Sequence, residues 1–114
     1  MRAWKRSLIS LNISKELSLL GLAAKAGRVV SGEFATEKAV KARKARLVLV
    51  AGDASDNSKK KFSDMCAYYK VPMYLVGTKE ELGGAIGKDY RASLGVTDDN
   101  FAVAMKKKLE QMGK

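Results

Sequence analysis

The stretch VVSGEFATEKAVKARKARLVLVAGDAS, residues 29–55, switches from a strand pattern to a helix pattern and back, and it decides the fold class. Residues 28–30 predict a short strand that ends at Ser31 and Gly32. A helix with a strongly basic outer face is predicted next, from apolar residues at helical spacing: Phe34, Ala39, Ala42 and Ala45. The continuous apolar run of residues 47–51 then predicts a central strand covered on both faces.

The same alternation continues on both sides of this stretch. Ser14 and Gly27 are typical helix-capping residues, so residues 15–26 predict a helix. Further helices are predicted over residues 57–70, 79–86 and from Asp98 or Asp99 to Met112, and further strands over residues 73–77 and 92–96. Alternating strands and helices predict an α/β fold, a single-domain α/β/α sandwich over residues 14–114 with a four-stranded mixed sheet.

The composition excludes several kinds of chemistry. At 114 residues the chain is expected to form one domain, and its 46% hydrophobic content is ordinary for a globular protein. It has no histidine and a single cysteine, Cys66, so common zinc sites and histidine-activated nucleophiles cannot be assembled. Cys66 falls on the apolar stripe of the 57–70 helix, which favours a core thiol. We expect no enzyme activity, no cofactor and no metal site.

The charge of +10 is concentrated in the first half of the chain. Residues 1–61 hold 14 basic and 5 acidic residues, a net +9, whereas residues 62–114 hold 8 and 7, a net +1. Clustered positive charge favours nucleic acid as a partner, with an anionic membrane second and simple solubility as the alternative. No apolar run is long enough to span a bilayer, so we expect a cytoplasmic protein without a membrane partner. Residues 1–13 are expected to form a basic, partly flexible arm, in which the role of Trp4 stays open.

Gly32 opens the predicted basic helix at a strand-to-helix turn. A glycine there lets a backbone approach a ligand closely, and the free amides of a first helical turn suit an anion such as phosphate. We expect Thr36 and Lys38 on the exposed first turns, where they strengthen this indication.

Four segments in order resemble a known family over residues 15–101: LLGLAAKAGRVVSGE, AVKARKARLVLVAGDAS, YYKVP and LGGAIGK. They are similar to the YlxQ group of bacterial proteins, within the ribosomal-protein superfamily that includes L-seven-Ae and L-thirty-e. The resemblance implies a three-layer α/β/α fold and a monomer that binds kink-turn RNA, a sharply bent duplex with sheared G·A pairs. It further implies that the start of the second helix and the loop before the last strand contact that RNA.

The resemblance also implies roles for individual residues. Gly32 matches the glycine that opens the helix, Lys38 the lysine at the sixth place, and Thr36 a place where a hydroxyl is common. The places that read G·A edges hold Phe34 and Ala35, which cannot make those hydrogen bonds. The implied RNA-contact set is Arg28, Ser31, Gly32, Glu33, Phe34, Thr36, Lys38, Lys41, Ala54, Ser55, Lys88, Tyr90, Arg91 and Ala92.

The side-chain chemistry of some of these residues suggests a particular role in RNA binding. Glu33 is expected to substitute as an acceptor for a guanine amino group. Tyr90 either stacks on a base or is a strand-edge residue, and Arg91 pairs with phosphate or stacks as a flat cation. Asp53, beside Ala54 and Ser55, is expected to be a structural turn and cap residue.

The sequence is consistent with two functions. The first is recognition of structured RNA, ribosomal or otherwise kink-turn-bearing. The alternative is a translation or ribosome assembly factor that acts mainly through protein contacts and has only non-specific RNA affinity. An exposed Phe34 would serve as a protein anchor in that alternative, whereas a buried one would be core.

Overall fold

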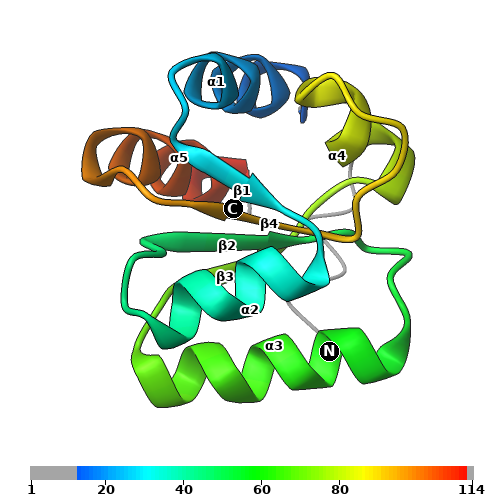
Figure 1. Cartoon of the computed structure of the whole chain (residues 1–114). Helices are drawn as coiled ribbons and strands as arrows, with labels where there is room; N and C mark the ends of the chain where they lie inside the picture. Colours follow the sequence, from blue (N-terminus) through cyan, green and yellow to red (C-terminus); the bar gives the residue numbers. More distant parts are fainter. Residues whose placement is uncertain (1–12, 113–114) are drawn as a thin grey trace.

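The computed structural model describes residues 13–112 and contains five helices and four strands (Figure 1). Trp4 and the rest of the predicted arm up to residue 12 lie outside the described residues. The elements in chain order are α1 (Ile13–Lys25), β1 (Val29–Ser31), α2 (Glu33–Lys41), β2 (Leu47–Val50), α3 (Asp56–Tyr69), β3 (Met73–Leu75), α4 (Lys79–Ala85), β4 (Ser93–Val96) and α5 (Asp99–Met112).

The four strands form one mixed sheet in the order β1-β4-β2-β3. β4 pairs antiparallel with both β1 and β2, and β2 pairs parallel with β3. Every residue of β2 and β4 is buried, as expected for strands with a neighbour on each side and helices on both faces. The predictions of a mixed four-stranded sheet and of a central strand are therefore confirmed, and the strand predicted over residues 47–51 ends one residue earlier, at Val50.

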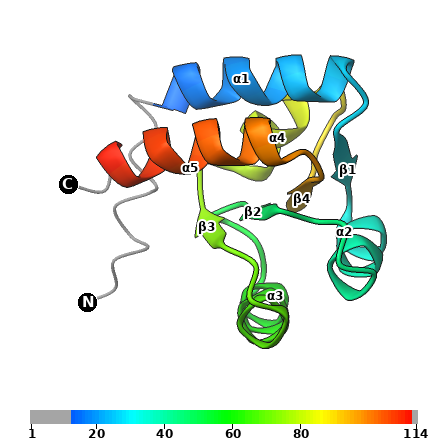
Figure 2. The same cartoon turned by 90° about the vertical axis from the view of Figure 1, so that its left-hand side faces the viewer.

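Helices cover both faces of this sheet. α1, α4 and α5 lie on one face, and α2 and α3 lie side by side on the other (Figures 1 and 2). The largest fully buried side chains come from the strands and from the helices on both faces; they include Leu47, Leu49, Leu94, Leu20, Leu82, Met105 and Phe62. Their burial joins the layers into one core, which confirms the α/β/α sandwich.

Side-chain caps explain where several helices begin. Ser55 Oγ accepts a hydrogen bond from Ser58 N at 3.1 Å, and Asp98 Oδ2 accepts one from Phe101 N at 3.0 Å. Thr78 and Glu81 form a reciprocal capping box at the start of α4. The predicted starts of these helices agree with the structure to within one residue, because each depends on a local cap.

The pattern predicted for the second helix is partly wrong. α2 ends at Lys41, because Arg43 adopts a left-handed backbone conformation with φ 62° and the chain turns toward β2. Ala42 is exposed, and Ala45 is buried beyond the helix. Phe34 lies within α2 but its side chain is 79% exposed, so only Ala39 of the four apolar residues is helical core.

No helix among residues 13–112 is both long enough and apolar enough to cross a membrane.

Candidate nucleic-acid interface

The antiparallel pairing of β1 with β4 brings together two segments that are 60 residues apart. Gly32 N donates a hydrogen bond to Ser93 O at 2.9 Å, directly after the paired residues Ser31 and Leu94. Arg91 Nε, just before β4, donates to Ser31 Oγ at 3.2 Å. The start of α2 and the loop that precedes β4 are thereby held side by side.

Gly32 is required by the turn between β1 and α2. Its φ of 94° and ψ of 157° lie in a region that is essentially restricted to glycine. A Cβ built at this position meets nothing within 4 Å, so the requirement comes from the backbone conformation and not from packing. The open space also leaves the backbone accessible at this point.

The first turn of α2 presents backbone amides that lack a side-chain cap. The N-cap residue Gly32 has no side chain with which to accept from them, and Thr36 N is the first amide bonded back to Gly32 O. Uncapped amides at a helix N-terminus carry partial positive charge and bind anions well. This end of α2 can therefore bind a phosphate.

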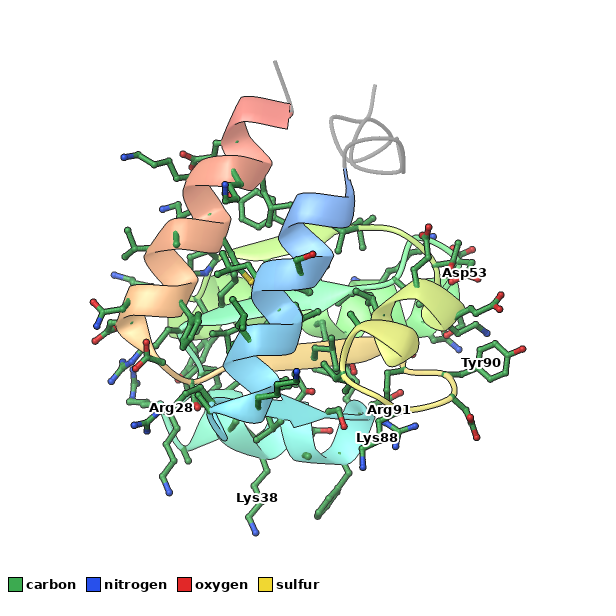
Figure 3. The ribbon with its side chains drawn as sticks, turned by 90° about the horizontal axis from the view of Figure 1, so that it is seen from above. Arg28, Lys38, Asp53, Lys88, Tyr90 and Arg91 are labelled. Carbon is green, nitrogen blue, oxygen red and sulfur yellow. The ribbon has the colours of Figure 1, made fainter. Side chains whose placement is uncertain are left out.

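Three cationic side chains lie along the edge of the molecule that contains this helix start. Figure 3 shows Lys38, Lys88 and Arg91 along one side of the view, with the Tyr90 ring beyond them pointing away from the body. Lys38 and Lys88 are exposed and Arg91 is half-buried. No carboxylate in the described part of the chain forms an ion pair with any of the three, so their charges are available to a polyanion.

The loop that carries Tyr90 is packed tightly on α4. A Cβ on Gly83 would lie 2.5 Å from Asp89 O and 2.9 Å from the Cα of Tyr90, so only glycine allows this approach. Lys88 N donates to Gly83 O at 2.8 Å, and Arg91 N donates to Lys79 O at 3.1 Å. The loop backbone is thereby fixed while Tyr90 is 62% exposed, and an exposed aromatic ring carried by a fixed backbone suits base stacking.

The loop of residues 52–55 is bonded to the start of α4, beside this region. Asp53 Oδ1 accepts from Lys79 N at 2.8 Å at the start of α4, which is the structural role expected of Asp53. Ser55 is the N-cap of α3, and Ala54 is buried. Ala51 N donates to the carbonyl of half-buried Ala92 at 2.8 Å, which connects β2 to the segment before β4.

The structure places three of the predicted contact residues away from the exposed part of this region. Thr36 is fully buried instead of exposed, because it faces the sheet, where its methyl group lies 3.5 Å from a Cβ built on Gly95. Ala54 is buried too, so neither side chain is accessible to an outside ligand. Arg28 precedes β1 and its carbonyl pairs with Thr97 N beyond β4, so it lies at the opposite end of the β1–β4 ladder from Arg91.

Glu33 and Glu37 on α2 are tied to α3 by a single lysine. Lys61 Nζ lies 3.0 Å from Glu33 Oε2 and 2.6 Å from Glu37 Oε1, and Ser58 Oγ donates to Glu33 Oε1 at 3.1 Å. The hydrogen bonds from Lys61 lower the pKa of both carboxyls below the ordinary 4.5 and raise the pKa of Lys61. Both oxygens of Glu33 already accept hydrogen bonds, which weakens its predicted role as a guanine acceptor. Lys41 is bonded to Glu37 at 2.9 Å, so its charge is partly compensated.

Contacts between α2 and α3, within one layer, account for part of what the sequence did not reveal. Ser58 and Lys61 orient the first turn of α2 from 25 and 28 residues away, and no sequence signal links these residues to Glu33. The exposure of Phe34 was likewise not visible, because its position fits either face of a short helix.

Two features of the described part of the chain bear on metal and thiol chemistry. Among residues 13–112 no group of three or more cysteine or acidic side chains is placed to hold a metal ion. Cys66 is buried in the core, and desolvation raises the pKa of its thiol to about 11. A thiol in that state is a poor nucleophile.

Comparison with known proteins gives a consistent picture. Residues 15–106 match the model of the Ribosomal protein L7Ae/L30e/S12e/Gadd45 family. The RNA-binding protein YlxQ of Bacillus subtilis (strain 168) is 49% identical over 84 residues, which are 74% of this chain and 84% of that protein. The RNA-binding protein YlxQ of Enterococcus faecium is 39% identical over 99 residues, 87% of this chain and 95% of that protein.

Two solved structures share the fold. A protein with unknown function from Bacillus halodurans C superposes with a TM-score of 0.82 at 41% identity, over 84% of this chain and 97% of that one. The Giardia lamblia 15.5kD RNA binding protein superposes with a TM-score of 0.77 at 24% identity, over 94% and 97% of the two chains. The second likeness is one of fold alone.

Proposed function

Because this chain belongs to the Ribosomal protein L7Ae/L30e/S12e/Gadd45 family, we propose that it binds structured RNA of the kink-turn type through the start of α2 and the Tyr90 loop. Both YlxQ relatives are described as RNA-binding proteins, which supports RNA as the ligand. We include in this proposal a monomer that acts in the cytoplasm on ribosomal or other kink-turn-bearing RNA.

One observation carries the proposal: the hydrogen bond of 2.9 Å from Gly32 N to Ser93 O. This bond sets the uncapped amides of α2 beside the loop that carries Arg91 and Tyr90. A bent RNA offers both ligands at once, because phosphates of its backbone reach the amides and cations while a base turned out at the bend stacks on Tyr90. Lys38 and Lys88 extend the positive field along this edge of the molecule (Figure 3).

Recognition in this proposal depends on the shape of the RNA more than on its base edges. Phe34 and Ala35 offer no hydrogen-bonding group to a G·A pair, and Glu33 is already bonded to Lys61 and Ser58. The bend then contributes selectivity because only a bent duplex brings a phosphate and an unstacked base to the two surfaces together.

The test is a titration of the full chain with a kink-turn duplex and with the same duplex after its bulge and G·A pairs have been repaired. We expect tighter binding to the kinked RNA, and affinity for both that falls steeply with added salt through counterion release. Equal affinity for the two RNAs would overturn kink-turn recognition and would leave only a general polyanion surface.

Lys38→Ala and Lys107→Ala form a matched pair for this titration. Both lysines are exposed, and each substitution removes one positive charge. Lys107, however, lies on α5, on the other face of the sheet. We expect Lys38→Ala to weaken binding of the kink-turn RNA about three- to tenfold, the loss of one charge-assisted contact, and Lys107→Ala to have a much smaller effect.

A second candidate function is supported by Phe34. An aromatic side chain 79% exposed beside the start of α2 is a ready anchor for a protein partner, as an assembly factor of the translation machinery would require. Affinity capture with immobilised wild type and with immobilised Phe34→Ala, each after ribonuclease treatment, distinguishes RNA binding from this second function. Partners that survive the ribonuclease and depend on Phe34 would favour this second function.

A further inference from the structure

A cluster of aromatic and cationic side chains lies at the far end of α2 and α3 from the proposed kink-turn site. Contacts between the helices advance in register, from Glu33 with Ser58 to Glu37 with Lys61 and Arg43 with Tyr69, so the two helices run in the same direction. Their C-terminal ends therefore meet at one end of this layer (Figure 1). Arg43 follows α2, and Tyr69 is the last residue of α3.

Tyr69 supports two groups that face solvent. The Cζ of Arg43 lies 5.2 Å from the centroid of the Tyr69 ring, a cation–π contact. The Tyr68 ring meets the Tyr69 ring edge to face, with centroids 4.9 Å apart and an interplanar angle of 78°. Tyr69 is half-buried, whereas the Tyr68 side chain is 76% exposed. The cluster thus presents the aromatic ring of Tyr68 and the guanidinium of Arg43 to solvent, both packed against the half-buried Tyr69 ring.

Positive charge around these rings is not compensated locally. Arg43, Lys44 and Lys70 are all exposed, and none forms an ion pair with a carboxylate of the described residues. The two segments that contribute the cluster, residues 38–52 and 65–79, contain no aspartate or glutamate. A partner for this surface must therefore bring negative charge.

The backbone holds two of these cations in an unfavourable conformation. Arg43 and Lys70, with φ of 62° and 60°, are the two non-glycine residues with positive φ among residues 13–112. Glycine or asparagine is the usual residue where a helix ends in this conformation. A long cationic side chain at both positions therefore costs conformational free energy locally. Binding of a negatively charged ligand by this surface would explain why cations occupy these positions.

We propose that Arg43, Lys44, Tyr68, Tyr69 and Lys70, here named the Tyr68 surface, bind single-stranded RNA. The exposed Tyr68 ring stacks on an unpaired base, and the three cations contact the neighbouring phosphates. Single-stranded RNA fits better than duplex because stacking on a side chain requires a base whose face is free. The nine residues of α2, about 14 Å of helix, separate this surface from the start of α2, so both can be occupied together.

The probe is a fluorescein-labelled oligouridylate of about eight nucleotides, within the usual site size for single strands. It is titrated by fluorescence anisotropy against the full chain at several salt concentrations. Tyr68→Ala should raise Kd for this probe at least about fivefold, whereas Tyr68→Phe, which keeps the ring, should leave Kd near that of wild type.

A double variant, Arg43→Gly with Lys70→Gly, removes two cations without endangering the fold, because glycine adopts positive φ readily. We expect the slope of log affinity against log salt to become shallower by about 1.4, the value for two phosphate contacts on a single strand. Lys106→Ala with Lys107→Ala on α5 removes two exposed cations elsewhere and is the matched control, which should change neither Kd nor the slope appreciably.

A duplex kink-turn without overhangs separates this inference from the proposed function. Tyr68→Ala should bind that duplex like wild type, and Lys38→Ala should bind the oligouridylate like wild type. Failure of wild type to bind the oligouridylate, or equal affinity of wild type and Tyr68→Ala, would overturn the Tyr68 surface whatever the kink-turn duplex shows. A loss with the Lys106→Ala, Lys107→Ala double variant as large as with Tyr68→Ala would also overturn it, in favour of general attraction to polyanions.

Discussion

Arg91 Nε donates a hydrogen bond of 3.2 Å to Ser31 Oγ across 60 residues of sequence. The same guanidinium donates through Nη1 to the carbonyl of Tyr90 at 2.6 Å. Two of its donors are therefore used to fix its orientation, and the remaining ones stay available to a phosphate. Arg91 is thus held in place at the junction of the two proposed RNA-contact segments before any ligand arrives.

This arrangement predicts unequal effects of two substitutions. Arg91→Ala should raise Kd for kink-turn RNA about tenfold or more, because a charged hydrogen-bonding group is lost. Ser31→Ala should raise Kd only about two- to threefold, because it removes the hydrogen bond that orients Arg91 and leaves the charge of Arg91 in place. Titrations of both variants check the order, and an effect of Ser31→Ala equal to that of Arg91→Ala would contradict it.

Phe34→Asn is predicted to change selectivity and not stability. The side chain is 79% exposed, so the free energy of unfolding should change by no more than about 0.5 kcal/mol in a urea titration. Asparagine supplies a donor and an acceptor where Phe34 has none, and preference for the kink-turn over the repaired duplex should rise about fivefold or more. Phe34→Ala is the control, since it removes the ring and adds no hydrogen-bonding group. An equal rise with Phe34→Ala would show that steric relief is the cause.

The sequence predicted the fold well because the decisive features are local. The buried run at residues 47–51 and the cap residues Ser55, Thr78 and Asp98 act within a few positions of themselves. The end and the buried face of α2 were harder to predict, because this helix has only nine residues and four small or aromatic candidates for its buried face. Its end depends on the left-handed conformation of Arg43, a residue type that seldom adopts it, and so no sequence signal marked it.

The positions of the candidate contact residues in the fold were predicted in part. Gly32, Lys38 and the Tyr90 loop could be located because glycine, charge and an aromatic residue are informative by type. The burial of Thr36 depends on which side of α2 faces Gly95, and the position of Arg28 depends on the antiparallel register of β1 with β4. Contacts that depend on tertiary packing, such as Glu33 with Lys61, require the structure.

Acid should weaken the contact between α2 and α3. Hydrogen bonds from Lys61 lower the pKa of Glu33 and Glu37 below 4.5, so their contribution to stability is present above that pH and is lost as pH falls through the lowered values. Urea unfolding at about pH 7 and about pH 3.5 should show a smaller loss of stability in Lys61→Met than in wild type. Lys60→Met, which breaks only the ion pair with Asp64, should keep the wild-type pH dependence. Identical pH dependence in wild type and Lys61→Met would show that Lys61 does not lower these two pKa values.

Cys66 is predicted to be unreactive in the folded protein. Its thiol is buried and its pKa is raised to about 11, so at about pH 8 both access and thiolate fraction are low. Labelling with a thiol reagent should therefore be slow in buffer and fast in concentrated urea, with mass spectrometry as the readout. Rapid labelling in buffer would indicate that α3 opens readily from the sheet.

Lys70→Gly is predicted to stabilise the protein. Lys70 ends α3 with φ 60° and ψ 45°, and its N–H donates to Cys66 O, the arrangement in which glycine is preferred. A non-glycine residue in this conformation costs about 1 kcal/mol, which the substitution by glycine recovers. Part of this gain in stability is offset by the greater conformational freedom of glycine in the unfolded chain. The free energy of unfolding should rise by about 0.5 kcal/mol, seen as a higher urea midpoint. Lys70→Ala keeps the unfavourable conformation and removes the same charge, so it should give no gain, and a gain equal to that of Lys70→Gly would assign the effect to charge.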